Sequence, residues 1–282
     1  MASSEHRAVF VSGASSGIGE AVAHHWLNRG YQVWGTARCR DRLTKFADQK
    51  NFHAVEFDLL DRSAALEAYE EAEKSAGGFG VVVNNAGFGL FGVLTEIPAR
   101  QWDEQLSAML TNTFMLVQRQ VELMVKRDRS ATLVNVSSLA VDFPLPFMAG
   151  YNVAKAGLSA LSESLLMELS KTPIRIIDFR PGDVRTKFNA AMQPSATVAP
   201  SAQPQKENME AAWRTLEQNL DQGPSPESVA VDLWRAVKSG RRGTVTTGGW
   251  FQATLAPFLI RLFPQGLARS VRWRYFEIGR AS

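Results

Sequence analysis

The sequence has almost no cysteine. Cys39 is the single cysteine among 282 residues, which excludes an internal disulfide and a cysteine-based metal cluster. Basic and acidic residues are also nearly balanced, and the formal net charge is only +3. This balance gives no reason to expect a nucleic-acid partner. No apolar run is long enough to cross a bilayer, and the N-terminal residues lack the pattern of a secretory signal. We therefore expect a cytoplasmic protein in a reducing setting, with no metal site.

Two kinds of hydrophobic pattern alternate along most of the chain. Short apolar runs predict buried strands, and longer periodic stretches predict helices. This alternation favours the α/β class, with a parallel sheet covered by helices on both faces. The predicted strands are 7–12, 31–36, 52–57, 79–83, 131–137, 174–179 and 244–247. The predicted helices are 17–27, 63–76, 101–127 (one helix or two in tandem), 151–170 and 224–239.

A glycine-rich turn follows the first predicted strand. Gly13, Gly17 and Gly19 have the spacing G-x3-G-x-G, and an apolar helical pattern comes next. Strand, glycine turn and helix in this order build a phosphate cradle, because the backbone can approach a pyrophosphate and the helix N-terminus favours negative charge. The turn predicts a dinucleotide site, although such a sequence can also form an ordinary tight turn.

The second predicted strand ends without an acidic residue. Dinucleotide folds usually place a carboxylate there to hold the adenosine ribose, but here Ala37 is followed by Arg38. A guanidinium suits a phosphate because of its fork of donors. Arg38 therefore favours NADP over NAD, unless it is simply a solvated surface residue.

Further polar residues follow the next strands. Asp58 ends the third strand, and Asn84 to Gly87 close the fourth. The amides of this second group could hold a ribose, brace a neighbouring loop, or belong to a simple turn. Asn112 lies inside the apolar helical region 101–127, where it could solvate a kink, hold a water or be a satisfied core amide.

The stretch 135–155 holds the candidate reaction centre. Tyr151 and Lys155 are four residues apart and share one face of a helix, and Ser138 follows the strand before it. A neighbouring ammonium favours the phenolate and lowers the tyrosine pKa from about 10. Tyr151 is thus the candidate acid/base, Lys155 the group that tunes it, and Ser138 the group that orients a substrate oxygen.

The pattern becomes irregular after the sixth strand. The segment 187–222 is a candidate lid over a substrate site, or a disordered segment, with a short amphipathic stretch at 209–220. Residues 250–278 are apolar and basic together, and could cover a pocket, form a subunit interface or lie on an anionic membrane. Six apolar side chains near the candidate centre predict a hydrophobic substrate pocket. They are Leu139, Phe143, Leu145, Phe147, Phe188 and Met192.

Taken together, these motifs resemble the short-chain dehydrogenase/reductase family. They are S-G-A-S-S-G-I-G, N-N-A-G, Ser138 thirteen residues before Tyr151, Y-x3-K, and P-G-x3-T after the sixth strand. The resemblance covers roughly residues 7–248. It implies a Rossmann-like, doubly wound fold with a mainly seven-stranded parallel sheet, together with the lid and a C-terminal helical extension. It also implies hydride transfer between a nicotinamide and a carbonyl/alcohol pair.

The same resemblance assigns roles to residues. Tyr151 would exchange the proton, Lys155 would bind the nicotinamide ribose, Ser138 would hold the substrate oxygen, and Asn112 would support a water relay. Asp58 would meet the adenine, Asn84 the adenosine ribose and Thr186 the carboxamide. The implied cofactor-binding residues are Gly13, Ser15, Ser16, Gly17, Ile18, Gly19, Arg38, Asp58, Leu59, Asn84, Ala86, Gly87, Tyr151, Lys155, Pro181, Gly182, Val184 and Thr186. Ser16 stands where some NADP-using members have a basic residue, so the preference for NADP rests on Arg38.

We therefore expect an NADP(H)-dependent oxidoreductase for a lipophilic ketone or secondary alcohol. The alternatives are a dinucleotide-binding sensor or scaffold without turnover, and an epimerase or dehydratase on the same fold. Residues 1–248 would form the catalytic domain, including the lid at about 187–222, and 249–282 would extend it. The expected assembly is a homodimer or homotetramer, with peripheral membrane contact through the tail as one option.

Overall fold

The structure is a computed structural model that describes residues 7–186, 188, 192, 203–249 and 265–278. Its centre is a seven-stranded sheet in the order β3-β2-β1-β4-β5-β6-β7, and every neighbouring pair is parallel. The order reverses beside β1, which makes the fold doubly wound. The strands are β1 (Ala8–Val11), β2 (Gln32–Ala37), β3 (Phe52–Glu56), β4 (Val81–Asn84), β5 (Ala131–Val136), β6 (Ile174–Pro181) and β7 (Gly243–Thr247).

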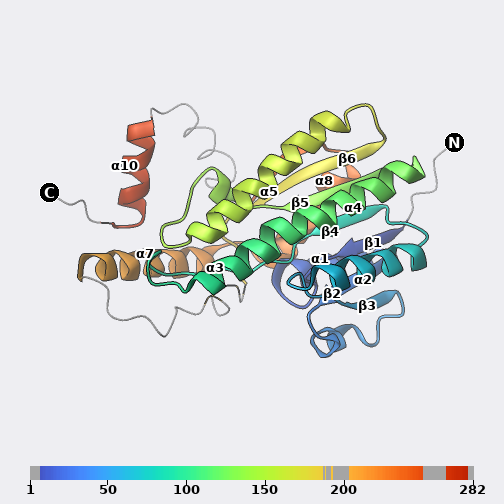
Figure 1. Cartoon of the computed structure of the whole chain (residues 1–282), viewed down its shortest axis with the longest axis horizontal. Helices are drawn as coiled ribbons and strands as arrows, with labels where there is room; N and C mark the ends of the chain where they lie inside the picture. Colours follow the sequence, from blue (N-terminus) through green and yellow to red (C-terminus); the bar gives the residue numbers. More distant parts are fainter. Residues whose placement is uncertain (1–6, 187, 189–191, 193–202, 250–264, 279–282) are drawn as a thin grey trace.

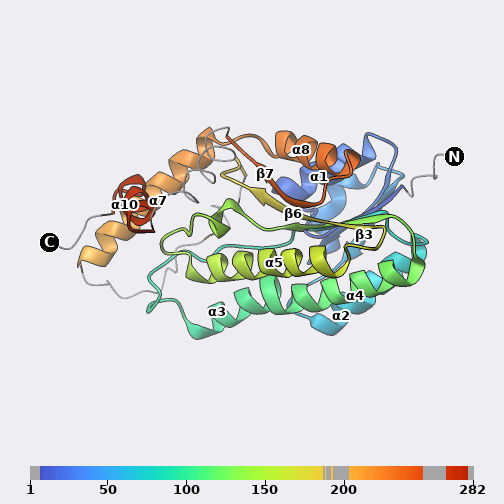
Figure 2. The same ribbon diagram turned by 90° about the horizontal axis from the view of Figure 1, so that it is seen from above.

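Helices cover both faces of the sheet (Figure 2). The helices α1 (Gly17–Leu27) and α8 (Pro226–Lys238) pack on one face, where Val22 and Leu233 share a core with β1 and β2 side chains. The helices α2 (Arg62–Ser75), α4 (Asn112–Arg127) and α5 (Ala149–Glu168) cover the other face, where Tyr69, Leu116 and Leu165 are buried. The central strands have apolar residues on both faces because neither face meets water.

The predicted strands are all present, with ends that differ by up to two residues. The helical region 101–127 is two helices in tandem. The first is α3 (Ala99–Leu106), and a wide π-type turn (η2, Ser107–Thr111) leads into α4. Short 3-10 turns lie at η1 (Arg40–Phe46) and η3 (Leu139–Val141). The amphipathic stretch predicted at 209–220 is part of the longer helix α7 (Gln203–Gln222).

Because all strands are parallel, their carboxyl ends lie at one edge of the sheet, where ligands bind in such folds. The helices α7 and α10 (Gln265–Tyr275) lie at the end of the molecule away from the N-terminus (Figure 1). No described helix combines the length and apolar character needed to cross a membrane.

Candidate active site

The turn between β1 and α1 has the shape of an anion cradle. Gly13 and Gly17 have φ angles of +72° and +58°, which favour glycine. A Cβ at Gly19 would lie 2.2 Å from the carbonyl oxygen of Gly13, so no side chain fits there. Ser16 is the N-cap of α1, yet its side chain makes no capping hydrogen bond. The first amides of α1 thus have no side-chain acceptor, and the cradle fits a dinucleotide pyrophosphate.

Asn85, directly after β4, braces this cradle, and its neighbour Asn84 at the end of the strand braces the sheet. The Asn85 side chain donates to the carbonyl oxygen of Ser12 at 3.1 Å, and the Ser12 hydroxyl accepts from the amides of Asn85 at 2.9 Å and Ala86 at 3.0 Å. Asn84 is buried and exchanges hydrogen bonds with Gln120. The Asn84 side chain also donates to Asn135 on β5, so it links β4, β5 and α4, and its expected place beside the adenosine ribose stays a prediction.

Cations lie beside the cradle. Arg38 is exposed at the end of β2 and has no hydrogen-bond or ion-pair partner among the described residues. Lys45, from η1, donates to the carbonyl oxygen of Ser15 at 2.9 Å and to the carboxylate of Glu20 at 2.8 Å. Sequence reasoning missed Lys45, because nothing in the spacing shows that η1 folds back onto the glycine turn.

Several of the expected cofactor residues line one narrow cleft beyond the cradle. Its walls are Ser12, Leu59, Asn84, Ala86, Met109, Thr113, Leu116, Lys155 and Leu158. A Cβ at Gly17 would lie 3.3 Å from the Thr186 methyl group, so the turn after β6 reaches the cradle. Gly182 donates its backbone amide to Thr247 at 2.8 Å, and Val184 is a core residue. Asp58 accepts from the amide of Leu60 at 3.0 Å.

Ser138, Tyr151 and Lys155 lie together at the carboxyl end of β5. The Lys155 ammonium donates to the carbonyl oxygen of Val136 at 2.7 Å and lies 5.7 Å from the centre of the Tyr151 ring. The Ser138 hydroxyl is close enough to Tyr151 to act on the titration of its phenol. Ser137, by contrast, bonds to Asp178. The geometry thus brings Ser138, and not its neighbour, to the tyrosine.

Burial controls the titration of this group. It raises the pKa of Tyr151 above 10, while the Ser138 hydrogen bond opposes the shift and Asp183 adds to it. Burial also lowers the pKa of Lys155 to about 8, against the field of Asp178. The expected net fall in the tyrosine pKa is therefore not found, because loss of water around the phenol outweighs the favourable neighbours.

Asn112 has a satisfied side chain. Its amide donates to the Leu59 carbonyl oxygen at 2.6 Å, and its oxygen accepts from the Arg62 guanidinium at 3.0 Å. This observation agrees with the core-amide alternative, and support of a water relay by this residue stays a prediction. The π-type turn η2 ends directly before Asn112.

An apolar cluster forms the wall on the tyrosine side. Leu145, Phe147, Phe188 and Met192 belong to it together with Tyr151, whose ring lies 5.7 Å from that of Phe188. Leu139 is buried in η3 and Phe143 is half-buried, but neither is a member. Met148, next to Phe147 in the sequence, is buried in the same cluster. The members that sequence reasoning did not assign to the pocket are Phe91, Met209, Ala212, Trp213, Leu216, Phe276 and Ile278.

Comparison with known proteins identifies the chain. The family model described as short chain dehydrogenase matches residues 7–197. The chain belongs to the short-chain dehydrogenase/reductase family. An uncharacterized oxidoreductase of Staphylococcus epidermidis is 30% identical over 66% of this chain and 81% of its own length. One of Schizosaccharomyces pombe is 25% identical over 83% of this chain and 78% of its own.

Solved structures agree with this assignment. A short-chain dehydrogenase from Streptomyces avermitilis has a TM-score of 0.77 and 26% identity, and the match covers 96% of both chains. The fold also matches a family member from Burkholderia phymatum in complex with NAD, with a TM-score of 0.78, 22% identity and coverage of 94% and 95%. The protein is therefore a dehydrogenase/reductase that binds a nicotinamide dinucleotide and acts on a small substrate.

No group of metal-ligating side chains suited to an ion occurs within the described ranges. The described end of the chain turns back toward the reaction centre, where Phe276 and Ile278 join the apolar cluster. The apolar residues expected to form the first part of the tail lie outside the described residues. They are Trp250, Phe251, Leu255, Phe258, Leu259, Ile260, Leu262 and Phe263.

Proposed function

We propose that this short-chain dehydrogenase/reductase is an NADP(H)-dependent enzyme for a lipophilic ketone or secondary alcohol. The observation that carries the proposal is the apolar cluster around Tyr151, whose buried members include Phe91, Met148 and Phe276. An apolar wall favours a steroid-, retinoid- or acyl-like substrate over a sugar or an acid, whose polar groups would lose water without gaining partners.

The residues of the site suit carbonyl reduction. A bound nicotinamide supplies or accepts the hydride. Ser138 orients the carbonyl oxygen by hydrogen bonding, and Tyr151 donates its hydroxyl proton to that oxygen as it becomes an alcohol. Lys155 holds positive charge beside the phenol, which stabilises the phenolate left behind. In oxidation of the alcohol, the phenolate takes the proton back.

The preference for NADP rests on Arg38, which is exposed and has no partner within the described part of the chain, and on Lys45 beside the cradle. Two cations near the adenosine ribose suit a 2′-phosphate better than a 2′-hydroxyl. Among solved structures with this fold, one from Burkholderia phymatum holds NAD and an alcohol dehydrogenase from Thermococcus sibiricus holds 5-hydroxy-NADP. The fold is thus compatible with either cofactor, and the basic residues decide between them.

A panel of carbonyl compounds tests the proposal. The consumption of NADPH and NADH is followed with 2-decanone, acetophenone and a 3-ketosteroid, and with dihydroxyacetone and pyruvate as small polar controls. We expect NADPH to be consumed with the lipophilic compounds. Faster turnover of the small polar carbonyls, or equal use of both cofactors, would contradict it.

Two other functions use the same fold. A sensor or scaffold would bind NADPH and never consume it. An epimerase or dehydratase would convert its substrate with no net change in cofactor. Ser138, Tyr151 and Lys155 are all present and lie together, which favours turnover over simple binding.

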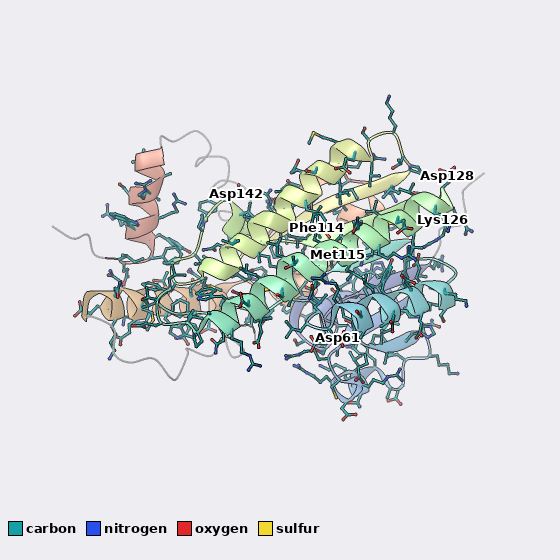
Figure 3. All side chains as sticks on the ribbon, in the orientation of Figure 1. Asp61, Phe114, Met115, Lys126, Asp128 and Asp142 are labelled. Carbon is teal, nitrogen blue, oxygen red and sulfur yellow. The ribbon has the colours of Figure 1, made fainter. Side chains whose placement is uncertain are left out.

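The assembly and the tail belong to the same proposal. Residues 1–248 form the catalytic domain and 249–282 extend it, and the described helix α10 and the residues after it close the pocket with Phe276 and Ile278. A homodimer or homotetramer would cover the outer face of α4 and α5, which carries exposed apolar side chains and includes Phe114, labelled in Figure 3. Those residues are Phe114, Val125, Val153 and Met167. Light scattering of the purified protein measures the oligomer directly.

A further inference from the structure

A buried polar network lies behind the reaction centre. Asp178, on β6, is fully buried and accepts hydrogen bonds from the hydroxyls of Ser137 and Ser159 and, at 2.7 Å, from the guanidinium of Arg180. Arg180 also donates to the Asp142 carboxylate at 2.9 Å and to the Ser159 hydroxyl at 2.7 Å. We call these five residues the Asp178 network. Figure 3 labels Asp142, which lies toward the end of the molecule that carries α7 and α10.

Burying a charged network of this kind has an unfavourable free energy of desolvation. Removing a carboxylate and a guanidinium from water costs more than packing apolar side chains of the same size, even when the two are paired. Both oxygens of Asp178 have partners, and Arg180 uses three nitrogens. Stability alone does not account for this arrangement, and the segments that it joins suggest its purpose.

Each member of the network adjoins a segment of the reaction centre. Ser137 directly precedes Ser138, and Asp142 begins the loop whose side chains form the apolar wall. Ser159 lies one turn beyond Lys155 on the same face of α5. A rigid set of hydrogen bonds therefore connects the strand end, the substrate-side loop and the catalytic helix.

The network also places charge near the catalytic lysine. Asp178 and Asp142 together with Arg180 carry a net charge of about −1 at neutral pH. The Lys155 ammonium faces Tyr151 on its own helix, the Val136 carbonyl oxygen of β5 and the field of Asp178 from β6, while Asp183 acts on the tyrosine. Of these groups, Asp178 opposes the effect of burial on the lysine and favours its charged form.

We propose that Asp178 and Arg180 are positioning residues for the reaction: Arg180 fixes the substrate-side loop and the catalytic helix against β6 through Asp142 and Ser159, and the buried carboxylate of Asp178 favours the charged form of Lys155. This inference rests on the proposed function and adds two separable roles to it. The fork of the Arg180 guanidinium fixes the loop and the catalytic helix relative to each other. The charge of Asp178 favours the protonated form of Lys155.

Asp178→Asn and Arg180→Lys separate these roles. Asp178→Asn keeps the shape and removes the charge, so the basic limb of the pH profile for ketone reduction should move down by about 0.5–1 pH unit, with turnover at pH 8 falling about two- to fivefold. Arg180→Lys keeps the charge and loses the fork, so kcat/KM should fall about tenfold or more with the pH profile in place. NADPH affinity should stay within about twofold in both, because neither residue is among the expected cofactor contacts.

Matched variants control the experiment. Arg175→Gln changes another arginine of β6. Arg175 lies near the start of β6 and donates to the Thr132 hydroxyl of β5, so this variant should leave the kinetics and the pH profile unchanged. If Asp178→Asn does not fold, Arg180→Lys decides the proposal through its effect on kcat/KM, because it keeps the charge and changes only the hydrogen bonds.

The proposal is overturned if Asp178→Asn folds and keeps the wild-type pH profile, or if Arg180→Lys keeps wild-type kcat/KM. A second measurement does not depend on turnover. The pH at which Lys155 begins to stabilise the fold, found by comparing unfolding with and without Lys155→Met, should lie lower in the Asp178→Asn background. An unchanged onset would contradict the charge role even if the protein proved not to be a ketone reductase.

Discussion

At the scale of single residues, spacing along a helix predicts which side chains lie close together, and burial determines the direction in which their pKa values shift. The four-residue spacing of Tyr151 and Lys155 is enough to put them on one face of α5. The direction of the tyrosine pKa shift could not be predicted in this way, because it depends on how much water the surrounding segments exclude. The hydrogen bonds of the Asn84 and Asn112 side chains could not be predicted either, because their partners lie 36 to 53 residues away in the chain.

Lys155 should make stability depend on pH in a defined window. Its pKa is about 8 in the folded protein and 10.5 ordinarily, so between these values the unfolded chain binds more protons. The free energy of unfolding should then rise with pH across this window, by up to about 3 kcal/mol, and the gain is lost as pH falls through 8.

Urea unfolding of the wild type and of Lys155→Met at pH 7.5 to 10.5 measures this effect, because the difference between the two curves cancels other groups. The wild type should gain on the variant as pH rises. Parallel curves would show that the lysine is not desolvated.

Arg38 should determine the choice of cofactor. A charge-assisted contact to a 2′-phosphate contributes about 1.5–3 kcal/mol, so Arg38→Ala should weaken NADPH binding roughly tenfold to a hundredfold and leave NADH binding nearly unchanged. Fluorescence titration gives both dissociation constants, and the double variant with Arg40→Ala removes a neighbouring cation that could substitute. Arg100→Ala, on α3, removes one positive charge elsewhere as a control. An equal loss of affinity for NADPH and NADH would show that Arg38 does not determine the choice between them.

At the scale of elements, the sequence predicts where strands and helices lie better than how their ends interact. Short apolar runs predicted all seven strands, because a buried parallel strand must be apolar on both faces. The wide turn η2 and the fold-back of η1 onto the cradle were not predicted, because both depend on tertiary contacts. The brace from Asn85 to Ser12 was one of three readings of the sequence, and only the packed structure selects it.

The turn between β1 and α1 should not tolerate a side chain at its third glycine. In Gly19→Ala the new Cβ would meet the Gly13 carbonyl oxygen and the Asn85 amide, so we expect a loss of about 1–3 kcal/mol in the free energy of unfolding and weaker NADPH binding. Gly249→Ala is the matched control, since nothing lies within 4 Å of its added Cβ. Thermal unfolding and NADPH titration compare the two. Equal behaviour of both variants would show that the cradle is not closely packed.

At the scale of the whole molecule, the sheet places the cradle and the reaction centre at one edge, and the chain's last helix adds to that edge. The family motifs end before residue 249, so they say nothing about the tail. Its basic and apolar composition is compatible with a pocket cover, an interface or a membrane contact. Phe276, 4% exposed and packed in the cluster of Tyr151, favours the pocket cover.

Phe276→Ala should therefore alter substrate use. Truncating a buried aromatic at the pocket wall should raise KM for 2-decanone and the 3-ketosteroid several-fold while NADPH affinity is kept. Leu267→Ala is the control on the same helix, because its side chain is 49% exposed. Matching kinetics for the two variants would mean that α10 does not serve the pocket.

Removing the residues after Gly249 tests the other two roles of the tail. Loss of activity on bulky ketones with the oligomer intact is the expected result. Loss of the oligomer would support an interface instead, and release from anionic liposomes only after truncation would support a membrane contact.

The most direct test of the account is the NADPH-dependent reduction of a lipophilic ketone by the wild type and Tyr151→Phe, measured together with NADPH affinity. The hydroxyl that Tyr151 loses acts mainly in the transition state, so turnover should fall by several orders of magnitude while NADPH binds nearly as before. The ring and its contact with Phe188 remain, so the variant should fold. Turnover near the wild-type value in Tyr151→Phe would show that another group supplies the proton, and the central claim would be wrong.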